Sequence, residues 1–163
     1  MLISAIEKIS DRINKISVAL CVFLLGALTV VTFAQIVCRV FFTALSWSEE
    51  AARYLLVWAT MLGAGCVYKA GSHISVTVAQ DLLPPVLKKY AKLLVQLLCM
   101  LVFAVIVVYG ARYVKLLGRQ KSSAFNMPIK YMYASIPMGG AIMFIHAFVD
   151  FWGLLSRRGG EGK

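Results

Sequence analysis

Four long apolar runs separated by charged residues constrain this chain more than any other feature. The runs cover residues 16–38, 54–68, 93–111 and 131–149, and a lysine, arginine or aspartate bounds each of them. A helix needs about 20 apolar residues to cross the hydrocarbon core of a bilayer, and three runs reach the usual length. The second run is short, but it suffices if residues 47–53 belong to the same helix. We therefore predict an all-α integral membrane protein with four transmembrane helices.

The composition agrees with insertion into a membrane. Of 163 residues, 61% are hydrophobic and the mean hydropathy is +0.81, whereas a soluble domain is closer to half apolar. The first run is longer than the apolar region of a signal peptide, which has roughly 7–15 residues, so we expect it to be retained. We predict one membrane domain over residues 1–155 and a flexible tail over 156–163. The expected spans are about 16–42, 46–70, 87–117 and 129–155.

An amphipathic helix is predicted ahead of the first span. Apolar residues recur there at spacings of four and three, with charged residues between them: Leu2, Ile6, Ile9, Ile13 and Ile16. Such a helix beside a span suits the membrane interface, so we expect it to lie there before the chain enters the bilayer. The alternative is a packed extension of the first span.

The segment 46–54, which reads Ser-Trp-Ser-Glu-Glu-Ala-Ala-Arg-Tyr, places two carboxylates and an arginine at the mouth of the second span. Charge at that depth is costly unless it is paired or reaches the interface. Arg53 lies four residues after Glu49 and three after Glu50, so helical spacing allows either pairing. We expect Arg53 to neutralise one of these glutamates.

Two faces separate along this second helix at 100° per residue. The aromatic–acidic face carries Trp47, Glu50, Tyr54, Trp58 and Met61. The opposite face carries small residues, which let membrane helices approach closely: Ala52, Ala59, Gly63 and Ala70. We expect the small face to pack within the chain and the aromatic–acidic face to be free for a partner. Complete burial of this helix in its own bundle is the alternative.

Few residues could hold a cofactor or a metal ion. The four cysteines lie in or beside the predicted spans without CxxC spacing: Cys21, Cys38, Cys66 and Cys99. A bis-histidine haem would require His73 and His146 to face one cavity. We expect instead that His146 pairs with Asp150, four residues later. No cofactor or metal is expected in this chain.

The span centres lack the chemistry of a self-sufficient carrier. A protein that moves an ionic solute needs polar groups near the bilayer midplane, yet the four runs contain no Asp, Glu, Lys or Arg. Pro137 predicts a kink in the last span, because proline leaves a backbone carbonyl unpaired. No second broken helix accompanies it to complete an inverted-repeat site. Two other readings stay open, a membrane anchor of a redox complex and a small homodimeric exporter.

The formal net charge of +10 favours contact with anionic lipid headgroups. Nucleic acid is not expected as a partner, because the basic residues are scattered between spans. The N-terminal segment, the 69–92 loop and the tail together carry 10 lysines and arginines, against 7 in the 39–53 and 112–130 segments. The positive-inside rule therefore predicts cytoplasmic N- and C-termini.

Several short motifs follow one another along the chain: Arg39-Val40-Phe41, the 46–54 segment, Trp58, Gly63, Gly71-Ser72-His73-Ile74-Ser75-Val76 and Ile136-Pro137-Met138-Gly139. Together they resemble the DctQ-like small membrane subunit of TRAP (tripartite ATP-independent periplasmic) transporters. Their order and spacing, with the four-span plan, extend the resemblance over nearly the whole chain. Thr77 departs from it, because such proteins often carry an acidic residue there.

The resemblance implies partners and a role that the residues alone do not. Such subunits pair with a large DctM-like membrane subunit in the bacterial inner membrane, which holds the solute and sodium sites. A DctP-like periplasmic binding protein delivers the solute, often an organic acid, and a sodium gradient drives uptake. The small subunit then scaffolds and anchors the large one. We expect nine residues to serve a subunit interface or a structural motif: Arg39, Trp47, Glu49, Glu50, Arg53, Tyr54, Trp58, Gly63 and His73.

Overall fold

The computed structural model describes residues 2–71 and 85–156, and within them the chain is α-helical. The helices are α1 (Leu2–Phe41), α2 (Ser46–Gly71), α4 (Pro85–Leu116), α5 (Lys130–Tyr133) and α6 (Ser135–Ser156). Four helical stretches are long and apolar enough to cross a membrane, the last of them running from Lys130 to Leu154 through α5 and α6. The prediction of an all-α membrane protein with four spans is confirmed.

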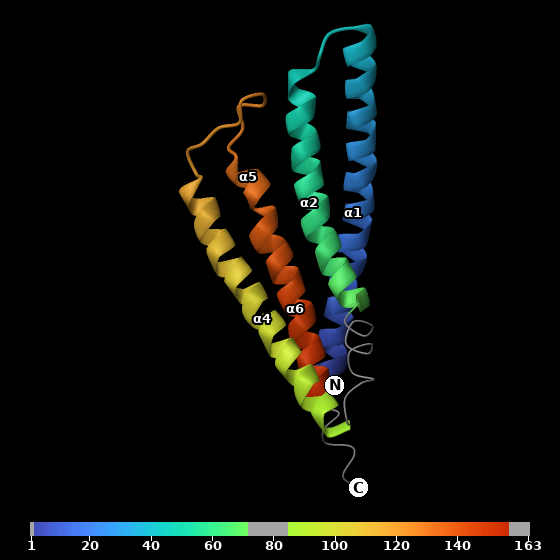
Figure 1. Cartoon of the computed structure of the whole chain (residues 1–163), viewed down its shortest axis with the longest axis vertical. Coiled ribbons are helices and arrows are strands. Elements are labelled where there is room, and N and C mark those ends of the chain that lie inside the picture. Colours follow the sequence, from blue (N-terminus) through green and yellow to red (C-terminus); the bar gives the residue numbers. More distant parts are fainter. Residues whose placement is uncertain (1, 72–84, 157–163) are drawn as a thin grey trace.

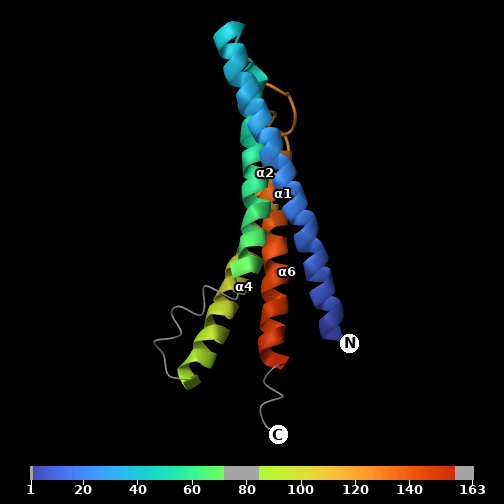
Figure 2. The ribbon, with the colours of Figure 1, turned by 90° about the vertical axis from the view of Figure 1, so that its right-hand side faces the viewer.

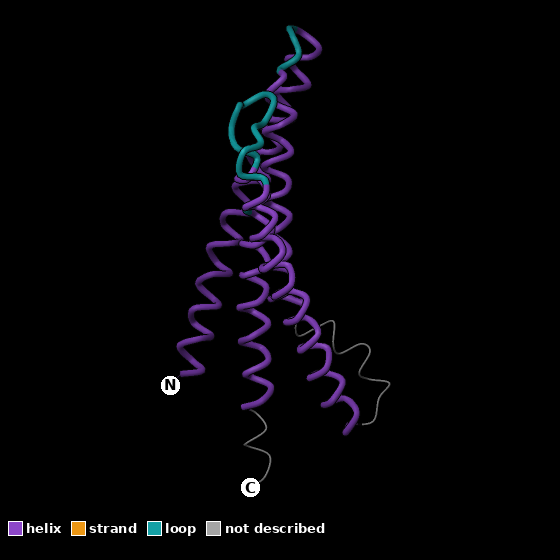
Figure 3. The backbone as a smooth tube through the Cα atoms, turned by 90° about the vertical axis from the view of Figure 1, so that its left-hand side faces the viewer, coloured by secondary structure: helices purple, strands orange, loops and turns teal. Residues whose placement is uncertain are grey.

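The helices run alternately up and down, as Figure 1 shows. α1 packs against α2, and α4 packs against α6, while α2 and α6 join the two pairs. We call the end where α1 begins and α6 finishes the terminal end, and the opposite end the loop end. The loop end carries the turn after α1 and the loop of residues 117–129, and Figure 3 shows that the α1–α2 turn extends beyond this loop.

α1 is one continuous helix of 40 residues, about 60 Å long at ~1.5 Å per residue. The expected separation between an interfacial helix and the first span was therefore wrong. Ser10 and Ser17 are both buried, because the first turns of α1 contact the rest of the bundle. Figure 2 shows α1 crossing α2 as an uninterrupted rod. The packed extension, which the sequence left open, is the arrangement observed.

Small residues mark the closest approaches between helices. A Cβ atom at Gly139 of α6 would lie 2.9 Å from the Met61 Cβ atom and 3.0 Å from the Met61 carbonyl oxygen of α2. A Cβ atom at Gly140 would lie 2.9 Å from Ile106 Cγ2 of α4. Adjacent glycines thus let α6 contact α2 and α4 at one level, as small residues do in membrane bundles.

The last span is interrupted close to Pro137. α5 ends at Tyr133 and α6 begins at Ser135, so Pro137 lies in the first turn of α6. Proline cannot donate to the carbonyl four residues earlier, which is that of Tyr133. In the first turn of a helix the N–H group has no acceptor within that helix, so proline costs no hydrogen bond there. The chain therefore places proline where a new helix can start.

Gly139→Ala tests the close approach of α6 to α2. The added methyl group meets backbone atoms, so we expect the unfolding free energy to fall by about 1–3 kcal/mol. Gly26→Ala is the control, because nothing lies within 4 Å of a Cβ atom there. Thermal denaturation in mild detergent compares the two, and equal unfolding temperatures would contradict this packing.

Candidate functional site

The loop of residues 117–129 has a defined turn that brings its tip to the start of α2. The Ser122 N–H donates to the Met127 carbonyl at 2.8 Å, and the Asn126 N–H donates to the Ser122 carbonyl at 3.1 Å. Asn126 has a φ of 53°, in the left-handed region that asparagine tolerates better than most residues. These bonds turn the chain back so that the backbone N–H groups of residues 124 and 125 face α2.

Glu50 fastens this tip to α2. Its Oε2 atom accepts hydrogen bonds from the backbone N–H groups of Ala124, at 2.9 Å, and Phe125, at 3.4 Å. Its Oε1 atom accepts a bond from the Tyr54 hydroxyl at 3.1 Å. A carboxylate that accepts N–H bonds forms stronger hydrogen bonds than a neutral acceptor does. The glutamate thus closes the loop onto its own chain.

Aromatic rings surround this contact. The Phe125 ring lies 6.1 Å from the Trp47 ring and 6.4 Å from the Tyr54 ring, centroid to centroid. Further along α2, Trp58 Nε1 donates to the Tyr131 carbonyl of α5 at 3.2 Å. Four residues of the aromatic–acidic face thus contact residues 124–131. We call this set the loop cluster: Trp47, Glu50, Tyr54, Trp58 and Phe125.

The expected pairing of Arg53 with Glu49 or Glu50 was wrong. Glu50 points toward the loop, whereas Arg53 and Glu49 are exposed. Neither glutamate forms an ion pair with Arg53, and the ion pair found among residues 7–71 and 90–154 joins Lys69 and Asp11. Backbone donors replace the guanidinium because the loop reaches the inner side of α2, while Arg53 lies on its outer side.

The remaining predicted residues are spread over the molecule. Arg39 is exposed near the end of α1. A Cβ atom at Gly63 would lie 3.4 Å from the Cys21 sulfur, so this glycine lies at the contact of α2 with α1. His73 lies outside the described residues, as does the predicted tail beyond Ser156.

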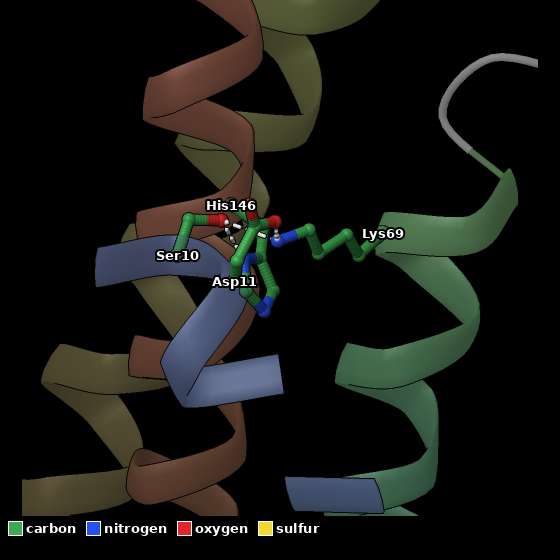
Figure 4. A network of polar contacts seen from close by, with 4 residues as sticks. All are labelled: Ser10, Asp11, Lys69 and His146. Carbon is green, nitrogen blue, oxygen red and sulfur yellow. Dashed lines mark hydrogen bonds and ion pairs between the residues drawn. The ribbon is translucent and has the colours of Figure 1, made fainter. Parts of the chain in front are cut away.

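A second polar cluster joins three helices where α2 ends (Figure 4). Ser10 Oγ of α1 lies 2.8 Å from Nδ1 of His146 in α6. Lys69 of α2 donates to Ser10 Oγ at 3.1 Å and also pairs with Asp11. Because the Lys69 ammonium donates a hydrogen bond to the serine oxygen, the serine O–H remains available to donate a hydrogen bond to His146. We call these four residues the terminal cluster.

Gln96 of α4 connects the third span to the same region. Its Nε2 atom donates to the Tyr68 hydroxyl of α2 at 2.9 Å and to the Ala147 carbonyl of α6 at 2.7 Å. Tyr68 and Ala147 are the sequence neighbours of Lys69 and His146. Gln96 and the terminal cluster therefore form one layer of polar contacts that crosses all four spans.

Sequence reasoning missed the terminal cluster. It placed Ser10 in an interfacial helix and expected His146 to bond to Asp150. The hydrogen bond of His146 goes instead to Ser10, 136 residues away in the chain. The sequence did contain a signal for this cluster, because the polar residues Gln96 and His146 interrupt apolar runs. A polar residue in a span usually has a partner on another helix.

The chemistry of both clusters is that of structural contacts. No group of three or more His, Cys, Asp or Glu that could hold a metal ion occurs among the described residues. His146 is 2% exposed, and its Nδ1 atom lies within hydrogen-bond distance of Ser10 Oγ. The fold and its clusters define a small multi-pass membrane protein whose polar side chains connect its own helices.

Comparison with known proteins identifies the family. The profile of "Tripartite ATP-independent periplasmic transporters, DctQ component" matches residues 28–157, most of the chain. The chain therefore belongs to the DctQ family of TRAP transporter small permease components.

Individual relatives agree with this assignment. A small permease protein of Haemophilus influenzae is 32% identical over 101 residues, which is 59% of this chain and 63% of that protein. The C4-dicarboxylate TRAP transporter small permease protein DctQ of Vibrio cholerae is 31% identical over 110 residues, 66% of this chain and 45% of that protein. The sialic acid TRAP transporter small permease protein SiaQ of Vibrio cholerae is 26% identical over 144 residues, 88% and 83%. The chain thus spans less than two thirds of the first two relatives.

Glu50→Ala tests the attachment of the loop. Without the carboxylate, the N–H groups of Ala124 and Phe125 lose their acceptor, so we expect amide hydrogen exchange at 122–127 to become on the order of tenfold faster. Glu49→Ala is the matched control, an adjacent exposed glutamate without these bonds. Exchange measured by mass spectrometry on both variants decides the matter. Equal exchange in the two variants would refute the contact.

Gln96→Leu tests the polar layer. It leaves the Tyr68 hydroxyl and the Ala147 carbonyl without this donor, and an unmade buried bond costs about 1–3 kcal/mol. We expect a lower unfolding temperature than for wild type. Gln35→Leu is the control, because the Gln35 side chain forms no hydrogen bond within the described residues. A Gln96→Leu protein as stable as Gln35→Leu would show that the layer contributes nothing.

Proposed function

We propose that this chain scaffolds and anchors the large DctM-like subunit of a TRAP transporter. In this proposal the complex takes up an organic acid, delivered by a DctP-like periplasmic binding protein and driven by a sodium gradient. The chain lies in the bacterial inner membrane with both termini in the cytoplasm. Membership of the DctQ family is the observation that carries the proposal.

The use of polar side chains supports a scaffolding role. The centres of the four apolar runs contain no ionisable Asp, Glu, Lys or Arg. Gln96 and His146, two buried polar side chains of α4 and α6, bond to other helices of the same chain. A solute or sodium site requires polar groups that are open to a ligand. We therefore assign those sites to the partner subunit.

A longer relative supports a large membrane partner. The sialic acid TRAP transporter permease protein SiaT of Haemophilus influenzae is 28% identical to this chain over 139 residues, which is 85% of this chain but 22% of that protein. A segment similar to this chain thus occurs inside a much longer permease. Where the segment is a separate chain, the remainder of such a permease is the natural partner.

The names of the relatives support the class of solute. They specify C4-dicarboxylate in one case and sialic acid in two others, and all of these are organic acids.

The loop cluster takes a revised role in this proposal. Because Glu50, Tyr54 and Trp58 bond within the chain, they shape the loop end and do not contact the large subunit directly.

Affinity capture tests the proposal. The tagged chain is extracted from native membranes in mild detergent, and the proteins that accompany it are identified by mass spectrometry. We expect one much larger multi-span protein in stoichiometric amount. Arg53→Ala should retain it, because Arg53 forms no ion pair with either neighbouring glutamate.

Other results of this capture would overturn the proposal. A chain recovered alone would favour the homodimeric exporter, and uptake by the chain alone in liposomes would confirm that reading. Iron–sulfur or flavoprotein subunits in the capture would favour the redox anchor.

A further inference from the structure

One face of α4 changes from aliphatic to basic along its length. At 100° per residue, five side chains of α4 spaced by four and three residues fall within one stripe, and a sixth follows in the turn after the helix. We call this the α4 stripe, and its members are Leu101, Val105, Val108, Arg112, Lys115 and Arg119. All six are exposed, with Leu101 at 60%. The stripe lies on the surface of the bundle and not between its helices.

The basic half of the stripe carries charge that this chain leaves unneutralised. Segments 39–53 and 112–130, which form the loop end, contain seven lysines and arginines and two glutamates. One of these glutamates, Glu50, is bonded to the loop. None of the three basic residues of the stripe forms an ion pair with a described acidic side chain. The stripe therefore offers positive charge to a ligand from outside the chain.

Aromatic rings place this charge at headgroup depth. The guanidinium carbon of Arg112 lies 5.6 Å from the centroid of the Tyr109 ring, and Lys130 Nζ lies 5.3 Å from the centroid of the Tyr131 ring. Both tyrosines are exposed. Exposed tyrosines beside basic residues at the end of an apolar span are typical of the boundary between hydrocarbon and headgroups.

The aliphatic half favours a lipid over a protein helix. Membrane helices associate through small residues, and this chain does so where Gly110 of α4 meets Pro137 of α6, since a Cβ atom at Gly110 would lie only 3.2 Å from Pro137 Cδ. The stripe has no small residue and presents Leu101, Val105 and Val108. Branched aliphatic side chains below a basic group match an acyl chain below a phosphate.

We propose that the α4 stripe binds an anionic phospholipid. Its phosphate contacts Arg112, Lys115 and Arg119, and an acyl chain lies along Leu101, Val105 and Val108. The site does not depend on the transporter role, because it uses only the outer surface of this chain. The net charge of the chain already favoured anionic lipid headgroups, and the stripe gives this contact a defined place on α4.

Native mass spectrometry of the full chain tests the site. The protein, with any subunits that accompany it, is titrated with phosphatidylglycerol or with phosphatidylcholine of the same acyl chains. We expect wild type to bind phosphatidylglycerol more tightly than phosphatidylcholine. The stripe variant combines Arg112→Gln, Lys115→Gln and Arg119→Gln, and its affinity for phosphatidylglycerol should fall about fivefold for each basic residue removed. Glycerol 3-phosphate at equal concentration should not compete, because it lacks acyl chains.

Two further variants control for charge and folding. The triple change Lys8→Gln, Arg12→Gln and Lys15→Gln removes the same charge from exposed positions of α1 at the terminal end, away from the stripe. We expect this variant to keep the lipid. The double change Arg112→Lys and Arg119→Lys keeps the charge of the stripe and should also keep the lipid. It shows whether substitution at these positions is tolerated, so that loss of lipid from the glutamine variant can be assigned to charge.

Four outcomes would overturn the proposal. One is equal retention of the two lipids by wild type, and another is equal loss of phosphatidylglycerol in both glutamine triples, which would indicate general attraction. The third is unchanged lipid binding with loss of an accompanying membrane protein from the stripe variant, which would show that protein covers the stripe. Competition by glycerol 3-phosphate would identify a phosphate site without a lipid.

Discussion

A polar group inside a bilayer must find its partner within the protein, and the rest of this structure depends on that constraint. The chain meets it with two sets of contacts. At the loop end Glu50 accepts backbone bonds from Ala124 and Phe125, and where α2 ends Ser10 bonds to His146 while Lys69 bonds to Ser10. Between them the helices meet through glycines and apolar side chains.

These contacts favour a fixed arrangement of the four spans. Gln96 and the terminal cluster connect every span to at least one other, and the loop cluster holds α2 to the segment that leads into α5. Moving the helices apart would expose bonded polar groups to lipid, which is costly. A rigid unit with a mostly apolar outer surface is consistent with the scaffolding role proposed above.

The four spans followed from the apolar runs, because length and hydropathy alone decide whether a helix can cross a bilayer. The continuity of α1 did not follow, since its amphipathic part and its apolar part have the same helical period. The partner of Glu50 also could not be predicted from the sequence. It is a pair of backbone N–H groups more than 70 residues away, and almost every residue type has such a group. Arg53, at helical spacing, was the visible candidate and the wrong one.

Cross-linking in native membranes tests most directly whether the aromatic–acidic face of α2 belongs to its own loop. Cysteines replace Tyr54 and Phe125, whose rings stack, in a chain without native cysteines, and a short bis-maleimide is added. Our account predicts a cross-link within the chain, and a weaker one when the cysteine at 54 is moved to exposed Arg53. A cross-link from position 54 to a larger protein, without the internal one, would contradict it.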